Sequence, residues 1–253
     1  MSQQYSTISS TDTAVYLHAW AGKAISAQVP REMMAFLTEA SISQLVADVL
    51  TASEALLQHL TLEQRRRLPL FLGTADGSLV EDLLFEHSRD VQAGRYASPA
   101  IFRRTLPNII LSEIALTCQL QGPGSTLVAG PASAALAVYR AITTMKHYNE
   151  PLAFAAAIEP LPPANAAPRF LLMLLGIQPP HDPRAADAKQ PPICVAAALA
   201  PSVGGKAKVP IHLSGEAGIQ AVSDAIQATG TSKQTISATA ATGLTIHLQF
   251  SAA

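Results

Sequence analysis

The sequence is poor in cysteine and in charged residues. Its two cysteines, Cys118 and Cys194, lie in apolar surroundings without CxxC spacing or a nearby histidine, which argues against a zinc site and against a disulfide framework. A reducing cytoplasm is therefore the expected location. Charged residues make up 14% of the 253 positions, the net charge is −1, and runs such as Arg65–Arg67 are too short to neutralise a series of phosphates. Nucleic acid is not an expected partner.

Long apolar runs and targeting signals are also missing. Apolar segments such as 170–177 are far shorter than the stretch needed to cross a bilayer. Residues 1–13 are polar and lack the basic segment and apolar core of a secretory signal. We therefore expect a protein with no membrane span and no targeting segment.

Common cofactor-binding and hydrolase motifs are absent as well. The stretch Gly73–Ser78 has neither GxGxxG nor GKS/T, so it favours a turn in which Asp76 or Ser78 caps the next helix. No GxSxG elbow is present. Neither a cofactor nor a metal ion is expected. The polar residues of the following helix are typical of a solvated face, and they are Glu81, Asp82, Glu86, His87 and Asp90.

Hydrophobic residues are abundant in the chain and make up 49% of it, which is enough to form a large buried core. Strands are expected at 14–20, 68–73, 151–158, 193–200 and 243–250, and helices at 41–60, 79–90, 109–120 and 215–229. This order indicates α/β architecture. His18, in the first strand, is interpreted as a packed core residue. The proline-rich stretch 161–192 is expected to be an irregular excursion, with an apolar segment of ambiguous type at 169–177.

One stretch, residues 125–142, has the shape of an active site without its chemistry. Leu127–Ala129 suits a buried central strand, Gly130 and Pro131 suit a sharp turn, and the alanines that follow suit a closely packed helix. In many α/β enzymes the residue at such an elbow is the nucleophile. Here that residue is Pro131, which has no nucleophilic atom.

The residues around this elbow resemble those of the β-ketoacyl synthases, which have the thiolase-like fold. Ser98-Pro99 opens an irregular segment, Asn108 leads into a helix, and Leu120–Pro123 leads to the strand and elbow, all at the family's spacing. The strand that ends in Gly73–Gly77 is similar to the family's Gly-Thr-x-x-Gly strand, and 153–159 resembles its Ala-Gly-Gly-Thr-Glu strand. The resemblance covers residues 14–160 clearly and the remainder weakly.

This resemblance implies a single ketosynthase-like domain with a layered α/β/α arrangement around a central mixed sheet. The second half of the fold would be truncated, and residues 193–253 would supply its closing strands and helix. In the family the elbow holds a cysteine that accepts the acyl chain as a thioester. Two catalytic histidines come from the family's second half. With Pro131 at the elbow and no histidine that follows a strand in the family's manner, no catalytic residue is implied here.

Within the family, the sequence most resembles the shortened, non-catalytic chain-length factors of the aryl polyene type of pathway. Such a subunit would form a heterodimer with an active β-ketoacyl synthase and shape the tunnel for a growing polyene or fatty-acid-like chain. An acyl carrier protein would act through the complex. The segment after Ser98-Pro99 reaches across the family's dimer, so Ile101 and Phe102 are candidate tunnel-end residues, although ordinary packing explains them equally well.

Four further residues are candidates that the resemblance implies. Pro131 and Ser133 are candidates for the same tunnel or interface. Arg103 and Arg104 are candidates for contact with the acidic carrier protein, although two adjacent arginines are more often a solvated face.

Two other functions are compatible with the sequence. An acyltransferase or hydrolase could use Ser125 or Ser133, but a serine nucleophile needs a base within hydrogen-bond reach. His147 lies about 20 Å from the elbow at the usual helical rise. Alternatively, the alanine-lined elbow could form an apolar pocket that binds a small molecule.

Overall fold

The computed structural model describes residues 14–24, 39–91, 98–159, 168–178, 193–201, 215–228, 233–239 and 244–252. The described strands form one mixed sheet in the order β3-β2-β4-β5-β1-β6-β8-β7. Their bounds are β1 Val15–Ala24, β2 Leu70–Thr74, β3 Gly124–Val128, β4 Leu152–Ile158, β5 Pro168–Gly176, β6 Ile193–Pro201, β7 Gln234–Thr239 and β8 Leu244–Ala252. The α-helices are α1 Glu39–Leu57, α2 Leu62–Arg67, α3 Leu79–Val91, α4 Pro99–Phe102, α5 Ile109–Thr117, α6 Ser133–Tyr148 and α7 Gly215–Ala228, and short 3₁₀ turns η2 and η3 cover Arg103–Thr105 and Gly130–Ala132.

The sheet has a parallel part and an antiparallel part. Strand β2 pairs in parallel with β3 on one side and with β4 on the other. Strand β5 is antiparallel to both β4 and β1, and β6, β8 and β7 form an antiparallel end. The chain's last strands join the rest of the sheet through three residues of β1, Val15–Leu17, which pair with β6. Strands β6, β8 and β7, from the last part of the chain, therefore extend the sheet that the earlier strands form.

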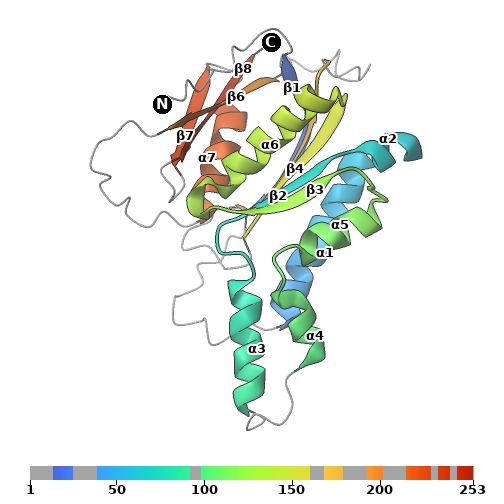
Figure 1. Ribbon diagram of the computed structural model, residues 1–253, viewed down its shortest axis with the longest axis vertical. Helices are drawn as coiled ribbons and strands as arrows, with labels where there is room; N and C mark the ends of the chain where they lie inside the picture. Colours follow the sequence, from blue (N-terminus) through green and yellow to red (C-terminus); the bar gives the residue numbers. More distant parts are fainter. Residues whose placement is uncertain are drawn as a thin grey trace, which may run out of the picture.

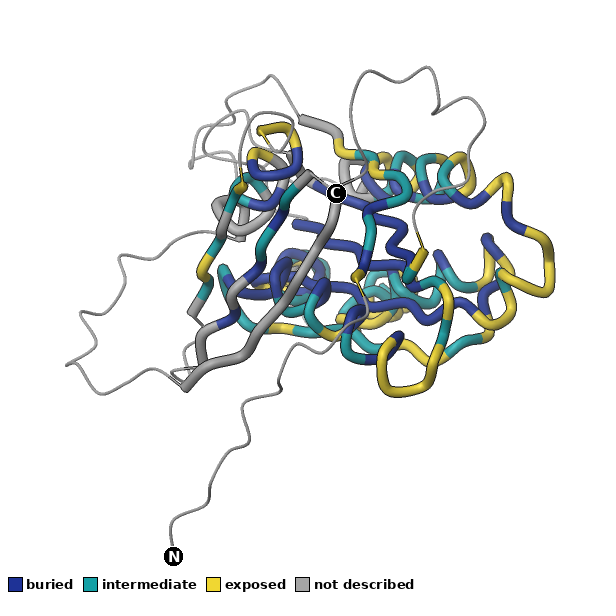
Figure 2. The backbone as a smooth tube through the Cα atoms, turned by 90° about the horizontal axis from the view of Figure 1, so that it is seen from above, coloured by how far each residue is buried: buried dark blue, intermediate teal, exposed yellow. Residues whose placement is uncertain are grey.

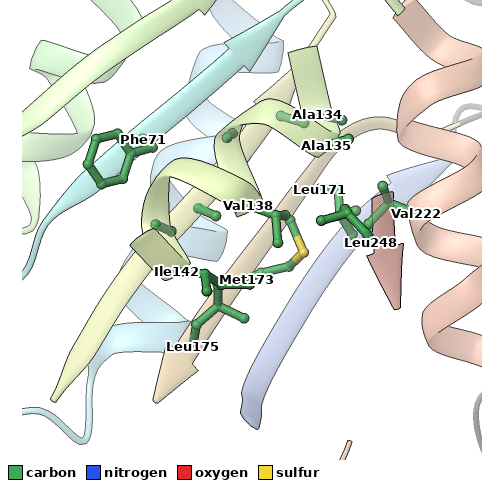
Figure 3. Close-up of a cluster of buried hydrophobic side chains, with 14 of the residues drawn as sticks. Phe71, Ala134, Ala135, Val138, Ile142, Leu171, Met173, Leu175, Val222 and Leu248 are labelled. Atoms are coloured by element: carbon green, nitrogen blue, oxygen red, sulfur yellow. The ribbon is translucent and has the colours of Figure 1, made fainter. Parts of the chain in front are cut away.

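Helices cover both faces of this sheet (Figure 1). Helices α6 and α7 pack on one face, where a core cluster includes Val138, Met145, Val222 and Leu248. Figure 3 shows side chains of α6 above Leu171, Met173 and Leu175 of β5, with Val222 of α7 and Leu248 of β8 beside them. Helices α1 and α5 pack on the opposite face, where a second cluster includes Leu57 and Ile114. The α/β/α layering expected from the sequence is confirmed.

The centre of the sheet is buried on both faces, as the dark tube in Figure 2 shows. In β5, Leu171, Met173 and Leu175 belong to the cluster under α6, whereas Phe170, Leu172 and Leu174 belong to the cluster under α1 and α5. Alternate side chains of a strand point to opposite faces, so a strand covered on both sides is apolar throughout. Among the described helices, none has the length and apolar character needed to cross a membrane.

The structure corrects three expectations drawn from the sequence. The apolar run at Leu127–Ala129 does not form a central strand, because β3 is the edge strand of the sheet. Part of the proline-rich stretch 161–192 is not irregular, because β5 occupies 168–176 in the sheet interior. The first strand is longer than the expected range 14–20, because β1 continues to Ala24. Residues 160–167 and 179–192 lie outside the described residues.

Candidate functional site

The elbow joins the edge strand β3 to helix α6. Ala129 has φ −143° and ψ 31°, and the 3₁₀ turn Gly130–Ala132 leads directly into the helix. Gly130 has φ +56°, and a Cβ at this position would meet nothing within 4 Å. The left-handed backbone, and not lack of space, is therefore what favours glycine there. Pro131 is half-buried at the expected nucleophile position and presents only ring carbons.

Ser133 holds the elbow together through backbone groups. Its Oγ accepts a hydrogen bond from the Ala129 N–H at 2.8 Å and can donate to the carbonyl oxygen of Gly130 at 2.7 Å or of Thr74 at 2.9 Å. The residue is 1% exposed. Because the hydrogen-bond partners of this hydroxyl group are all backbone groups, no side-chain base is in position to activate it. Ser133 therefore links the end of β3 to the end of β2.

The approach of α6 to β2 depends on Gly73. A Cβ on Gly73 would lie 2.2 Å from the Ser133 carbonyl oxygen and 2.5 Å from the Ser133 carbonyl carbon. The start of the helix is also buried in the core, through Ala132 of η3 and Ala134, Ala135 and Ala137 of α6. These alanines fill the interior and do not line an apolar pocket.

None of the described histidines forms a hydrogen bond with Ser133. His147 is exposed in the last turn of α6, and its ring meets Tyr148 edge-on at 4.6 Å. His18 occupies an irregularity in the β1–β5 register, where its Nε2 lies 2.8 Å from the Gln178 carbonyl oxygen. His18 is half-buried and belongs to neither core cluster, so it is not the packed core residue that the sequence suggested. In the described part of the chain, no three His, Cys, Asp or Glu side chains are grouped as metal ligands.

The candidate tunnel-end residues lie in the short α4–η2 segment, residues 99–105. Ser98 caps α4, since its Oγ accepts the Ile101 N–H at 3.3 Å. Ile101 is half-buried, whereas Phe102 is 60% exposed. The Phe102 ring packs against Phe85 of α3, with 5.3 Å between ring centroids. Their role in a tunnel stays a prediction.

The two adjacent arginines of this segment differ in their surroundings. Arg103 is exposed. Arg104 is half-buried, and its Nη1 donates to Ser43 Oγ on α1 at 3.0 Å. Contact of either arginine with a carrier protein stays a prediction, and Arg103 is the more accessible of the two.

Glu81 is a buried carboxyl group that sequence reasoning placed wrongly on a solvated face. It is 3% exposed, and its Oε2 is buried without a hydrogen-bond partner. Burial raises the pKa of Glu81 above its usual value; the hydrogen bond to its own backbone opposes this shift, Asp82 adds to it and Arg104 counteracts it. Asp82, Glu86 and His87 are exposed as expected. No sequence signal separates Glu81 from these residues, because apolar Leu79 and Leu83 face outwards on the same helix.

Replacing Glu81 with glutamine is expected to stabilise the protein at neutral pH. Because the pKa is raised in the folded state, ionisation of Glu81 lowers stability as pH rises from the unfolded value of about 4.3 through the folded value. Glu81→Gln removes this loss, so we expect a gain of about 1 kcal/mol at pH 8 and almost none at pH 4. Urea unfolding at both pH values measures it. A Glu86→Gln control, at an exposed carboxyl group of the same helix, should leave the wild-type pH dependence in place.

Several large apolar side chains are exposed on β3, on helices α3, α4 and α5, and on the segment between η2 and α5. They are Leu79, Leu83, Phe102, Leu106, Leu116 and Val128, and we refer to them together as the β3-edge surface. The contributing elements are joined to one another: Ser78 Oγ of the α3 start donates to the Thr105 carbonyl at 2.5 Å, and a Cβ on Gly77 would lie within 4 Å of both Pro107 and Val128. Exposed apolar side chains on elements that contact one another can form an interaction surface.

Comparisons with known proteins agree with this geometry at the level of fold. No protein-family model matches the sequence, and no curated protein matches it. A chain of the ketosynthase ApeO in complex with its chain length factor ApeC from Xenorhabdus doucetiae is similar, with TM-score 0.59 and 12% identity over 94% of this chain and 99% of that one. The ishigamide ketosynthase/chain length factor gives TM-score 0.63 and 14% identity over 94% and 99%.

A third similar structure is a type II polyketide synthase complex in which an acyl-carrier protein is held by its ketosynthase, with TM-score 0.62 and 10% identity over 96% of this chain and 100% of that one. At such identities the likeness concerns the fold and not the activity. The protein therefore has the thiolase-like α/β fold that ketosynthases and their chain length factors share.

Proposed function

We propose that the chain is a non-catalytic subunit of the chain-length-factor type, which pairs with an active β-ketoacyl synthase and shapes the acyl tunnel of the pair. The observation that carries this proposal is the elbow. A strand, a 3₁₀ turn and a helix form it, Pro131 stands where the sequence resemblance places the nucleophile, and the nearby Ser133 hydroxyl is buried against backbone groups. Such an elbow can hold the surrounding strands and helix in position, but it cannot hold an acyl group as an ester or thioester.

The β3 edge supports the partnership. Strand β3 pairs only with β2 in the described sheet, and it carries neither charge nor proline, the features that protect free edges from other strands. The β3-edge surface includes Val128, the last residue of this strand. We infer that the partner ketosynthase covers this edge and these side chains together, in an interface of about 2,000 Å² or more, as expected for an obligate pair. The aryl polyene class of pathway and delivery of substrate by an acyl carrier protein belong to the same proposal.

Co-expression tests the pairing. The chain and a ketosynthase encoded beside it should co-purify as a stable heterodimer that condenses acyl groups, whereas the chain alone should neither condense them nor take up an acyl label. A serine enzyme would give a different result, because the isolated chain would release free thiol from an acyl thioester and Ser133→Ala would abolish the release. A stable, soluble monomer that does not bind the co-expressed ketosynthase would refute the proposal.

Enlarging Phe102 tests the tunnel. Phe102 is exposed beside Phe85, so Phe102→Trp adds volume without disturbing the core. In the heterodimer we expect products shortened by at least one extension unit, and Ile101→Trp should act in the same direction. Mass spectrometry of the released chains measures the change. Leu62→Trp, on an exposed leucine of α2, is the matched control and should leave product length unaltered; unchanged products in both tunnel variants would exclude these two positions.

A further inference from the structure

Helices α3 and α4 lie beyond one end of the sheet (Figure 1). Together with η2 they form a unit that we call the α3–α4 arm, because α3 packs mainly against α4 and η2. Within the arm, Phe102 of α4 rests against Phe85 of α3. The arm begins at residues 75–78, the turn that joins β2 to α3. The conformation of this turn therefore sets the direction of the arm and the place of Phe102.

The carboxyl group of Glu159 holds the first residue of this turn. Glu159 directly follows β4, an interior strand that pairs in parallel with β2. Its Oε1 accepts a hydrogen bond from the Ala75 N–H at 2.8 Å, and Glu159 is only 3% exposed. Loss of either partner of a buried hydrogen bond leaves the other one unsatisfied, which is unfavourable. The bond therefore fixes the turn to the end of β4.

The other end of the same turn holds the segment that carries the candidate tunnel-end residues. Ser78 Oγ donates to the Thr105 carbonyl oxygen of η2 at 2.5 Å. Gly77 has φ +63°, and a Cβ there would lie 3.6 Å from the Pro107 side chain, so the turn also packs beside the end of this segment. A displacement of the turn would therefore move η2 and, with it, the neighbouring Phe102.

We propose that Glu159 is a positioning residue for the tunnel end, and that it fixes where Ile101 and Phe102 lie. It acts through other residues, because the contacts run from its carboxyl group to the turn of residues 75–78 and from this turn to η2. The inference rests on the proposed function, since the tunnel belongs to the pair with the ketosynthase. The hold of Glu159 on the arm can nevertheless be measured in the chain alone.

Hydrogen–deuterium exchange of the full chain, followed residue by residue with NMR, tests this hold. In Glu159→Ala the Ala75 N–H loses its acceptor, so its protection should fall about tenfold or more. The Phe102 N–H, which donates to the Ser98 carbonyl oxygen, should lose about threefold because the arm opens more often. Glu159→Gln keeps an Oε1 acceptor and should restore both values. Failure of this rescue, or an equal loss of protection throughout α6, would mean that Glu159 only stabilises the fold.

Two further variants make this test decisive. Glu150→Ala is the matched control, because Glu150 precedes β4 at its other end and its carboxyl group contacts Arg67 of α2 at 3.3 Å. This variant should leave the Ala75 and Phe102 amides at wild-type protection. If Glu159→Ala does not fold, Glu159→Asp takes its place, because its carboxyl group ends one carbon short of the Ala75 N–H. It should show the same losses, and unchanged protection would overturn the proposal.

Product length in the heterodimer tests the effect on the tunnel. With the arm less well held, Glu159→Ala should broaden the distribution of chain lengths and reduce the main wild-type product by about half or more. Glu159→Gln and Glu150→Ala should keep the wild-type distribution, and mass spectrometry of the released chains measures all three.

Phe102→Trp separates failure of this inference from failure of the proposed function. If Phe102→Trp shortens the products and Glu159→Ala leaves them unchanged, Glu159 does not position the tunnel end although the proposed function stands. If the wild-type chain forms no heterodimer, the proposed function is wrong and the tunnel role of Glu159 falls with it.

Discussion

A single methyl group at Gly73 is expected to be among the most destabilising changes in the protein. In Gly73→Ala the new Cβ would lie 2.2 Å from the Ser133 carbonyl oxygen and 2.5 Å from its carbon. These are backbone atoms of the first turn of α6, so no side chain can rotate away. The helix must move off β2, which opens the core cluster beneath it and breaks the bond from Ser133 Oγ to Thr74. We expect the free energy of unfolding to fall by about 3 kcal/mol or more.

Gly130→Ala is the matched control, because it adds the same methyl group a few residues away. Gly130 has φ +56° but nothing within 4 Å of its Cβ position, so the cost is that of a left-handed alanine, about 1 kcal/mol. Urea unfolding followed by circular dichroism measures both variants. Equal losses would mean that backbone conformation, and not the approach of α6 to β2, controls the stability of the elbow.

The elbow can therefore be explained as a packing device. Gly73, the buried alanines of α6 and the Ser133 hydroxyl together let a helix start directly against two strand ends. In an enzyme this geometry would present a nucleophile. Here the same geometry sets the position of α6, of the β3 edge and of the turn at Gly77 that contacts Pro107 and Val128.

Sequence spacing predicted the elbow well because its constraints are local. The Gly-Pro turn and the run of alanines each leave a signature in neighbouring residues, whereas the approach of Gly73 to Ser133 joins distant parts of the chain and was not predicted. Strand order left no such signature. Leu127–Ala129 is as apolar as a central strand, yet β3 lies at the edge of the described sheet. An edge strand that a partner protein covers is buried like a central strand, so the two have the same apolar sequence pattern.

Two other errors have different physical causes. Prolines around 168–176 suggested an irregular segment, but they flank β5 and only Pro168 lies within it, at its first position, where no ladder bond is lost. Glu81 was misplaced because a helix with both apolar and acidic residues on several sides does not define its own rotation. Contacts with α4 and η2, which come later in the sequence, decide which side of α3 is buried.

A charge on the β3 edge is expected to abolish partner binding while the chain itself stays folded. Val128 ends β3 and is 54% exposed, so Val128→Asp should change the stability of the isolated chain by less than about 0.5 kcal/mol. In the proposed heterodimer the same carboxylate would be buried at a strand edge without a counter-charge, which costs several kcal/mol and corresponds to at least a 100-fold loss of affinity.

Co-purification with the ketosynthase and size-exclusion chromatography measure that loss, and circular dichroism of the isolated variant shows whether the chain has stayed folded. Leu62→Asp provides the matched control, because Leu62 is a similarly exposed apolar residue on α2, outside the β3-edge surface. It should bind the partner as the wild type does. A Val128→Asp chain that still co-purifies in full would mean that the partner docks elsewhere. The unprotected edge of β3 would then need another explanation, because an uncharged free edge exposes a protein to self-association.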